Sequence, residues 1–116
     1  MTDTELNIAV ARARGWTLDG DLWHIPSDDP DIEMEVMFTD SYSPATDIAQ
    51  AWELVEEMRQ GKRIVHLDGD GSGFYFQFWS GEKRDPHDGA GADTAPRAIC
   101  LAYLKVKRTV GERGRK

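Results

Sequence analysis

The chain has 116 residues, 40% of them hydrophobic and 30% charged, which predicts one folded domain and excludes a disordered chain. No apolar run approaches the roughly 18 residues that a membrane span needs, and a single cysteine, Cys100, excludes an internal disulfide. The acidic N-terminus does not have the pattern of a signal peptide, so we expect a cytoplasmic protein.

The net charge of −7 is unevenly distributed along the chain. Residues 105–116 carry six basic residues and one acidic residue (+5), which leaves −12 for residues 1–104. An acidic body repels nucleic acid phosphates and membrane surfaces, so neither is an expected partner. We expect a single domain over residues 1–106, followed by a basic, disordered tail over residues 107–116.

Three segments have the 3.6-residue periodicity of amphipathic helices. We expect these helices near residues 3–14, 44–60 and 95–107. Thr2 and Glu5 have the spacing of a capping box before the first helix. Ser43 is a good N-cap for the second helix, with Pro44 at its first position. Trp52 falls on the apolar stripe of the second helix, so we expect it in the core.

Several shorter segments have strand character. We expect strands near residues 22–25, 32–38, 63–68 and 74–79. The glycine-rich segment 68–73 predicts a hairpin turn, and residues 80–93 are expected to form a long polar loop. No alternation of strands and helices requires a parallel sheet. The predicted fold class is therefore α+β, with a mostly antiparallel sheet of three to four strands and helices packed on it as an α-β-α sandwich.

The segment 32–38 alternates with a period of two, which predicts a strand with one buried face. We expect that buried face to hold Ile32, Met34, Val36 and Phe38. The alternate positions are Glu33, Glu35 and Met37, so we expect the opposite face to meet solvent or a basic partner.

Two helical segments and one turn resemble a known family. Residues 42–52, YSPATDIAQAW, resemble the YSTDIAxAW run of the phage ABA sandwich domain family, but contain two extra residues, Pro44 and Ala45. Residues 93–102, DTAPRAICLA, are similar to the C-terminal helix of that family, and residues 15–16, GW, to its opening. The resemblance implies a small sandwich domain encoded by a phage or prophage, and hence a place in the host cytoplasm. It implies no established activity and no catalytic residue.

The motifs that could carry chemistry are weak. Asp68, Asp70 and Ser72 match the start of a calcium-binding loop, but Trp79 stands where the closing glutamate belongs, so we expect a plain turn. Cys100 lies on a helical apolar face and is expected to be a core residue. No zinc-ligand spacing links the three histidines, His24, His66 and His87. We therefore expect no catalytic residue, no metal and no cofactor, and a protein that is not an enzyme.

The remaining aromatic residues leave two interpretations open. Tyr75 and Trp79 share the strand face opposite the phenylalanines, and they are core residues if a helix covers that face. Three helices are enough to cover both faces, so we expect core. If that face is open, Trp79 becomes a stacking platform for a partner or a base. Trp16 and Trp23 are open to the same alternatives.

The uneven charge favours a binding function. We expect a phage accessory protein that inhibits a host (defence) protein by docking on its basic surface, without catalysis. The expected partner-binding residues are Asp28, Asp29, Asp31, Glu33, Glu35 and Met37. One alternative is a small-ligand protein that binds or sequesters nucleotides with its tryptophans and glycine loop. The other is a metal-dependent hydrolase built on the scattered carboxylates.

Overall fold

A computed structural model of the chain describes residues 2–26, 34–60, 63–80 and 89–113. Its elements in chain order are α1 (Asp3–Ala13), β1 (Thr17–Asp19), β2 (Leu22–Pro26), β3 (Met34–Phe38), a 3₁₀ turn η1 (Thr39–Ser41), α2 (Ile48–Gln60), β4 (Arg63–Asp70), β5 (Gly73–Ser80), β6 (Gly89–Ala92) and α3 (Ala95–Arg113). The helices predicted near 3–14, 44–60 and 95–107 are therefore all present.

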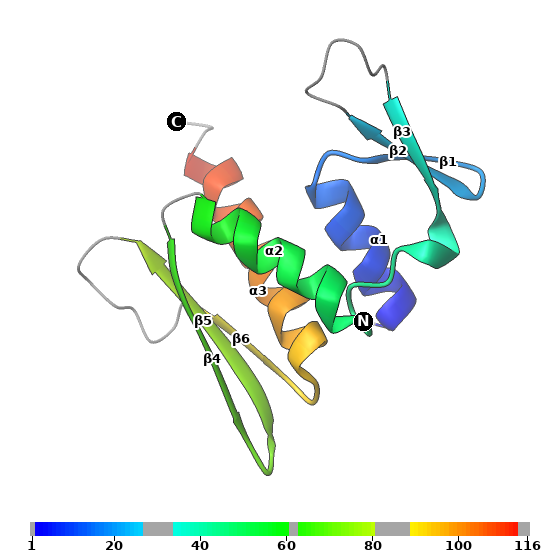
Figure 1. The fold of residues 1–116 in the computed structure, drawn as a ribbon. Helices are drawn as coiled ribbons and strands as arrows, with labels where there is room; N and C mark the ends of the chain where they lie inside the picture. The colour runs from blue at the N-terminus through cyan, green and yellow to red at the C-terminus, as the bar shows by residue number, and fades with distance from the viewer. Residues whose placement is uncertain (1, 27–33, 61–62, 81–88, 114–116) are drawn as a thin grey trace.

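The strands of the described residues form two antiparallel sheets. Sheet A has the order β1-β2-β3 and sheet B the order β4-β5-β6. Figure 1 shows the three helices as a layer between the two sheets. The α+β class and the antiparallel pairing are confirmed, but the strands do not share one sheet. Within each sheet, every strand pairs with its neighbour in sequence, so the loops between paired strands are short. In the sequence, α2 separates the three strands of sheet A from the three strands of sheet B.

The core lies where the helix layer meets the two sheets. Each helix contributes side chains that are fully buried: Leu6 and Val10 from α1, Leu54 and Val55 from α2, and Ile99 and Tyr103 from α3. Trp23 closes the core under sheet A, and Phe76 and Phe78 close it under sheet B. Burial of these apolar surfaces is the main stabilising term of the fold.

Hydrogen bonds at the N-terminal ends of two helices fix where those helices begin. The capping box of α1 is present, since Glu5 N donates to Thr2 Oγ1 and Thr2 N to Glu5 Oε1, both at 3.1 Å. The predicted Ser43 cap of α2 is wrong. Asp47 caps α2 instead, and its carboxylate accepts from Ala49 N at 2.9 Å. The segment before it forms a turn in which Thr46 N and Asp47 N donate to the carbonyl oxygen of Ser43, at 3.0 and 2.9 Å. Ala45 N donates to Asn7 Oδ1 at 2.9 Å and anchors this turn to α1.

Two further elements depart from the sequence prediction. β6 lies inside the segment 80–93 that was expected to be a polar loop, and it pairs with β5. Glycine and alanine have low strand propensity, so the pattern of Gly89–Ala92 carries no strand signal. The helix α3 continues past residue 107 to Arg113, so helical backbone extends into the segment 107–116 that was expected to be a disordered tail.

Candidate functional site

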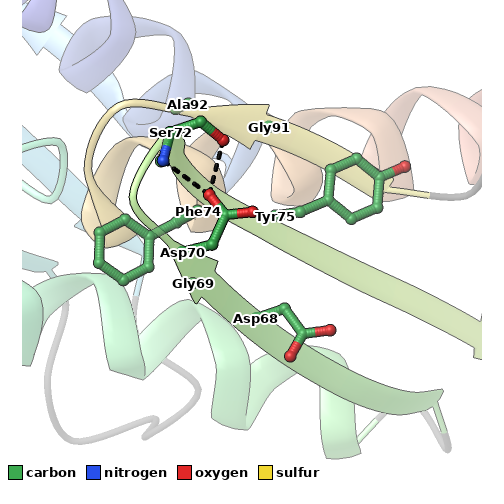
Figure 2. Close-up of a pocket in the computed structure, with 9 residues that line it drawn as sticks. Asp68, Gly69, Asp70, Ser72, Phe74, Tyr75, Gly91 and Ala92 are labelled. Carbon is green, nitrogen blue, oxygen red and sulfur yellow. Dashed lines mark hydrogen bonds between the residues drawn. The ribbon is translucent and has the colours of Figure 1, made fainter.

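The hairpin between β4 and β5 holds the calcium-like motif and borders a hollow of about 680 Å³. Figure 2 shows the Asp70 carboxylate turned towards Ser72, whose hydroxyl and backbone N–H donate hydrogen bonds of 2.6 and 2.7 Å to Oδ1. The hydroxyl, and then the N–H, hold the pKa of Asp70 below its ordinary value. The Asp70 side chain therefore closes a tight turn, as the sequence predicts.

Asp68 makes a separate contact on the same strand. Its Oδ2 lies 3.0 Å from Nε2 of His66, and in Figure 2 its carboxylate points away from that of Asp70. Trp79, which occupies the place of the closing ligand, lies within β5. In the part of the chain that the structure describes, no three His, Cys, Asp or Glu side chains lie together as metal ligands.

The four tryptophans divide between core and surface. Trp16 and Trp23 are buried, with their rings edge to face at 6.4 Å between centroids, so neither can stack on a ligand. The prediction that Trp52 lies in the core is wrong, because it is 46% exposed. Trp79 is partly buried and Tyr75 is 37% exposed, on a face of sheet B that no described helix covers. The expectation that the helices cover both faces of this sheet is therefore wrong.

Cys100 is fully buried in α3 and belongs to the core, as predicted. Burial raises the pKa of its thiol to about 12. A cysteine in this setting remains protonated near neutral pH, whereas the thiolate is the nucleophilic form. Cys100 is therefore a packing residue.

The buried and exposed faces of β3 are the reverse of the prediction. Met37 packs against the core and lies opposite Trp23 in the strand register. Val36 and Phe38 point outwards and are 58% and 66% exposed. The cause is tertiary. Trp23 fills the space under sheet A, and the register places Met37 beside it, so the side chains on either side of Met37 must face outwards.

The outer face of sheet A combines apolar side chains with carboxylates. One row across the three strands is Asp19, Leu22 and Phe38, and the next is Thr17, His24 and Val36. Nε2 of His24 lies 3.5 Å from Oδ2 of Asp19. Exposed Asp21 and Asp40 follow at the end of the sheet where Thr39 N donates to the carbonyl of Asp21. The three strands contain no lysine or arginine. The exposed apolar side chains Val36 and Phe38 lie on the edge strand β3, and the carboxylates of Asp19, Asp21 and Asp40 lie at the end of the sheet where β3 finishes with Phe38.

The predicted partner-binding residues fall into two groups. Asp28, Asp29, Asp31 and Glu33 lie outside the described residues. Glu35 is exposed, but it shares the inward side of β3 with the partly buried Met37. Sequence reasoning missed Val36 and Phe38 as surface residues. Met37 is the signal that could have identified them. It is an apolar residue at an alternate position, so either face of the strand can pack against the core.

Comparison with known proteins gives a family. A model of the phage ABA sandwich domain matches residues 12–104. The chain belongs to this family. It is therefore a phage accessory protein built on an ABA sandwich domain. No curated protein and no solved structure matches the chain. No helix among the described residues is long and apolar enough to cross a membrane.

Several residues of the family motifs of this ABA sandwich domain occupy packing positions. Tyr42 and Ala51 of the central motif are buried, and so are Trp16 of the opening and Ile99 of the C-terminal helix. Gly15, before Trp16, has a φ of +87° and ends α1 in the left-handed conformation that favours glycine. Packing in the fold explains these positions, but Ile48 and Trp52 of the central motif are exposed, at 51% and 46%.

Proposed function

We propose that this phage ABA sandwich domain is a non-catalytic binding protein that docks on a basic surface of a host protein through the outer face of sheet A. The observation that carries the proposal is the exposure of Val36 and Phe38 on the edge strand β3 of that face. Inhibition of a host defence protein is the role that we assign to this binding. A host cytoplasmic location follows from that role.

The apolar part of this surface supports a protein partner. Phe38 is 66% exposed beside the half-buried Leu22, and Val36 continues the patch along the strand. Monomeric proteins rarely leave neighbouring large apolar side chains in water, and such patches mark contact surfaces. Aromatic side chains at the centre of an interface supply most of its affinity. We therefore assign the affinity to Phe38 and Val36.

The charged part of the surface supports a basic partner. Asp19, Asp21 and Asp40 are exposed at the end of the patch next to Phe38, and the strands of sheet A offer no lysine or arginine to neutralise them. The chain as a whole carries −7. Carboxylates at a rim attract a basic partner from a distance, and they change the association rate more than the final affinity.

The experiment compares the wild type with surface variants as bait in host lysate, followed by rate measurements on the purified partner. The double variant Val36→Ser/Phe38→Ser should lose the partner. Asp19→Lys/Asp21→Lys should slow association by about tenfold at low salt, with a smaller effect at high salt. Ile48→Ser is the matched control, because it removes an apolar side chain of similar exposure, 51%, from α2.

Two results support the proposal together: binding that depends on Val36 and Phe38 but not on Ile48, and an association rate that falls with salt. A partner that still binds the double serine variant contradicts it. So does an association rate that is independent of salt and of Asp19 and Asp21. Capture of a nucleotide in place of a protein would favour the small-ligand alternative instead.

A further inference from the structure

A second surface lies between α2 and β4, in the half of the molecule that contains sheet B (Figure 1). It is a hollow of about 650 Å³. Three residues of α2 and three of β4 line it: Trp52, Val55, Arg59, Arg63, Ile64 and Val65. It contains none of the residues assigned to the binding of a basic partner, so the inference below does not depend on the proposed function.

The hollow opens along the free edge of β4. Val65 packs against the core, on the side of the strand that faces the helices. Ile64 points to the opposite side and is 51% exposed. The hollow touches Ile64 on one side of β4 and α2 on the other side. It must therefore pass around an edge of the strand. One edge of β4 pairs with β5 along Arg63–Asp70, so the hollow lies at the other edge, which is unpaired among the described residues.

An unpaired strand edge offers backbone hydrogen bonds to an incoming strand. At alternate residues of β4 the N–H and C=O groups point away from β5. Such an edge is a template for an extended segment of another chain. Beside it, Trp52 is 46% exposed, and its indole can cover an apolar side chain of that segment. The site thus has the two parts that strand addition needs, a free edge and a side-chain pocket.

The charge of the hollow indicates what kind of segment it can bind. Arg59 and Arg63 line it, and the residues that line it include no carboxylate. Among the described residues Arg63 has no ion pair, and the ion pair of Arg59 is with the exposed Glu56, at 3.4 Å. The surrounding protein is acidic, at −7. Two guanidinium groups in such a protein form a local site for carboxylates, which arginine binds in bidentate fashion.

We propose that the groove between α2 and the free edge of β4 binds an extended acidic segment of a partner protein, which adds to sheet B as a fourth strand. Arg63 and Val65 lie on the same side of β4, two residues apart. The segment therefore presents a carboxylate to Arg59 and Arg63 and an apolar side chain two positions away to Trp52.

The probe is an mRNA-displayed library of random octapeptides selected on the full-length protein. The selected peptides should share an acidic residue and an apolar residue two positions apart. Binding of the consensus peptide, measured by fluorescence anisotropy, should weaken about tenfold or more in Arg63→Glu and in Trp52→Ala. Arg12→Glu is the matched control, because Arg12 is an exposed arginine on α1, outside the groove, and its reversal should leave binding within about twofold.

A second readout tests the strand itself. Hydrogen exchange followed by NMR should show new protection at alternate amides of β4 when the peptide is bound. Circular dichroism of each variant confirms that it is folded. A selection without a consensus, a basic consensus, or binding that Arg63→Glu leaves unchanged would overturn the proposal. Protection of these same amides without peptide, together with a dimeric mass in sedimentation, would also overturn it. The free edge of β4 would then pair with a second copy of the chain.

Discussion

The indole of Trp16 lies against the phenol ring of Tyr42, with 4.4 Å between the ring centroids. The guanidinium of Arg14 is 4.9 Å from the centroid of the Trp16 ring and donates a hydrogen bond of 3.2 Å to the Tyr42 hydroxyl. Trp16 and Tyr42 are both buried, at 8% and 2% exposed. The contact joins the end of α1 to the segment that follows sheet A, so it holds that sheet against the helix layer.

Removal of the Tyr42 hydroxyl tests the polar part of this contact. We expect Tyr42→Phe to lower the free energy of unfolding by about 1 kcal/mol, since it removes one hydrogen bond and leaves the ring in place. Tyr42→Ala should cost about 3–5 kcal/mol, because it leaves a cavity beside Trp16. Urea denaturation measures both values. Equal losses in the two variants would show that the ring itself adds nothing.

Gly89 tests the close approach of β6 to β5. A Cβ atom at this position would lie 2.5 Å from the carbonyl oxygen of Phe76 and 3.0 Å from the ring of Tyr75. We expect Gly89→Ala to lower the free energy of unfolding by about 1–3 kcal/mol, because the backbone of β5 has to move. The control is Gly71→Ala in the hairpin turn, where a Cβ meets nothing within 4 Å and the change should stay within about 0.5 kcal/mol. Thermal and urea denaturation of the pair measure the difference, and equal stability of the two variants would contradict the packing of β6.

Cys100 gives the stability a dependence on alkaline pH. Burial raises the pKa of its thiol from 9.0 to about 12, so the unfolded chain releases this proton first. Its contribution is complete below about pH 9 and is lost as the pH rises towards 12, by about 1.4 kcal/mol per pH unit. We expect Cys100→Ala to flatten the fall in the free energy of unfolding between pH 9 and 11, measured by urea denaturation at each pH. A wild type and variant with parallel pH profiles would refute this assignment.

Local sequence signals predicted the helices and the hairpin because those elements depend on contacts between near neighbours. The pair Thr2 and Glu5 fixes the start of α1 with two hydrogen bonds that involve only its own first turn. The cap of α2 was misplaced for the opposite reason. The carbonyl of Ser43 closes the turn before Asp47, and Asn7 on α1 anchors that turn through Ala45 N, a hydrogen bond that no local pattern contains.

Long-range packing determines the features that local sequence patterns did not predict. Tyr75 lies over Gly89 and Gly91, and their lack of a side chain is what lets its ring approach β6. A glycine–alanine run predicts a loop until its aromatic partner is known. In the same way, the exposure of Trp52 depends on where β4 packs against α2, although its position on the apolar stripe of the helix indicates core.

The inverted faces of β3 give the last prediction, which also tests the surface assigned to partner binding. Apolar residues occupy both sides of this strand, so its period of two identifies a strand but does not decide which side is buried. Met37 packs against the core beside Trp23, whereas Phe38 is 66% exposed. We expect Met37→Ser to lower the free energy of unfolding by about 2 kcal/mol, because it removes packed apolar surface. Phe38→Ser should change it by about 0.5 kcal/mol or less, since its side chain is already in water. Urea denaturation of the two variants at neutral pH makes the comparison, with Trp23→Ala as the reference for a full loss of packing under sheet A, at about 3–5 kcal/mol. If Phe38→Ser were the more damaging of the two serine variants, the faces would have to be exchanged. The apolar patch of sheet A would then be buried, and the proposed docking surface would be lost with it.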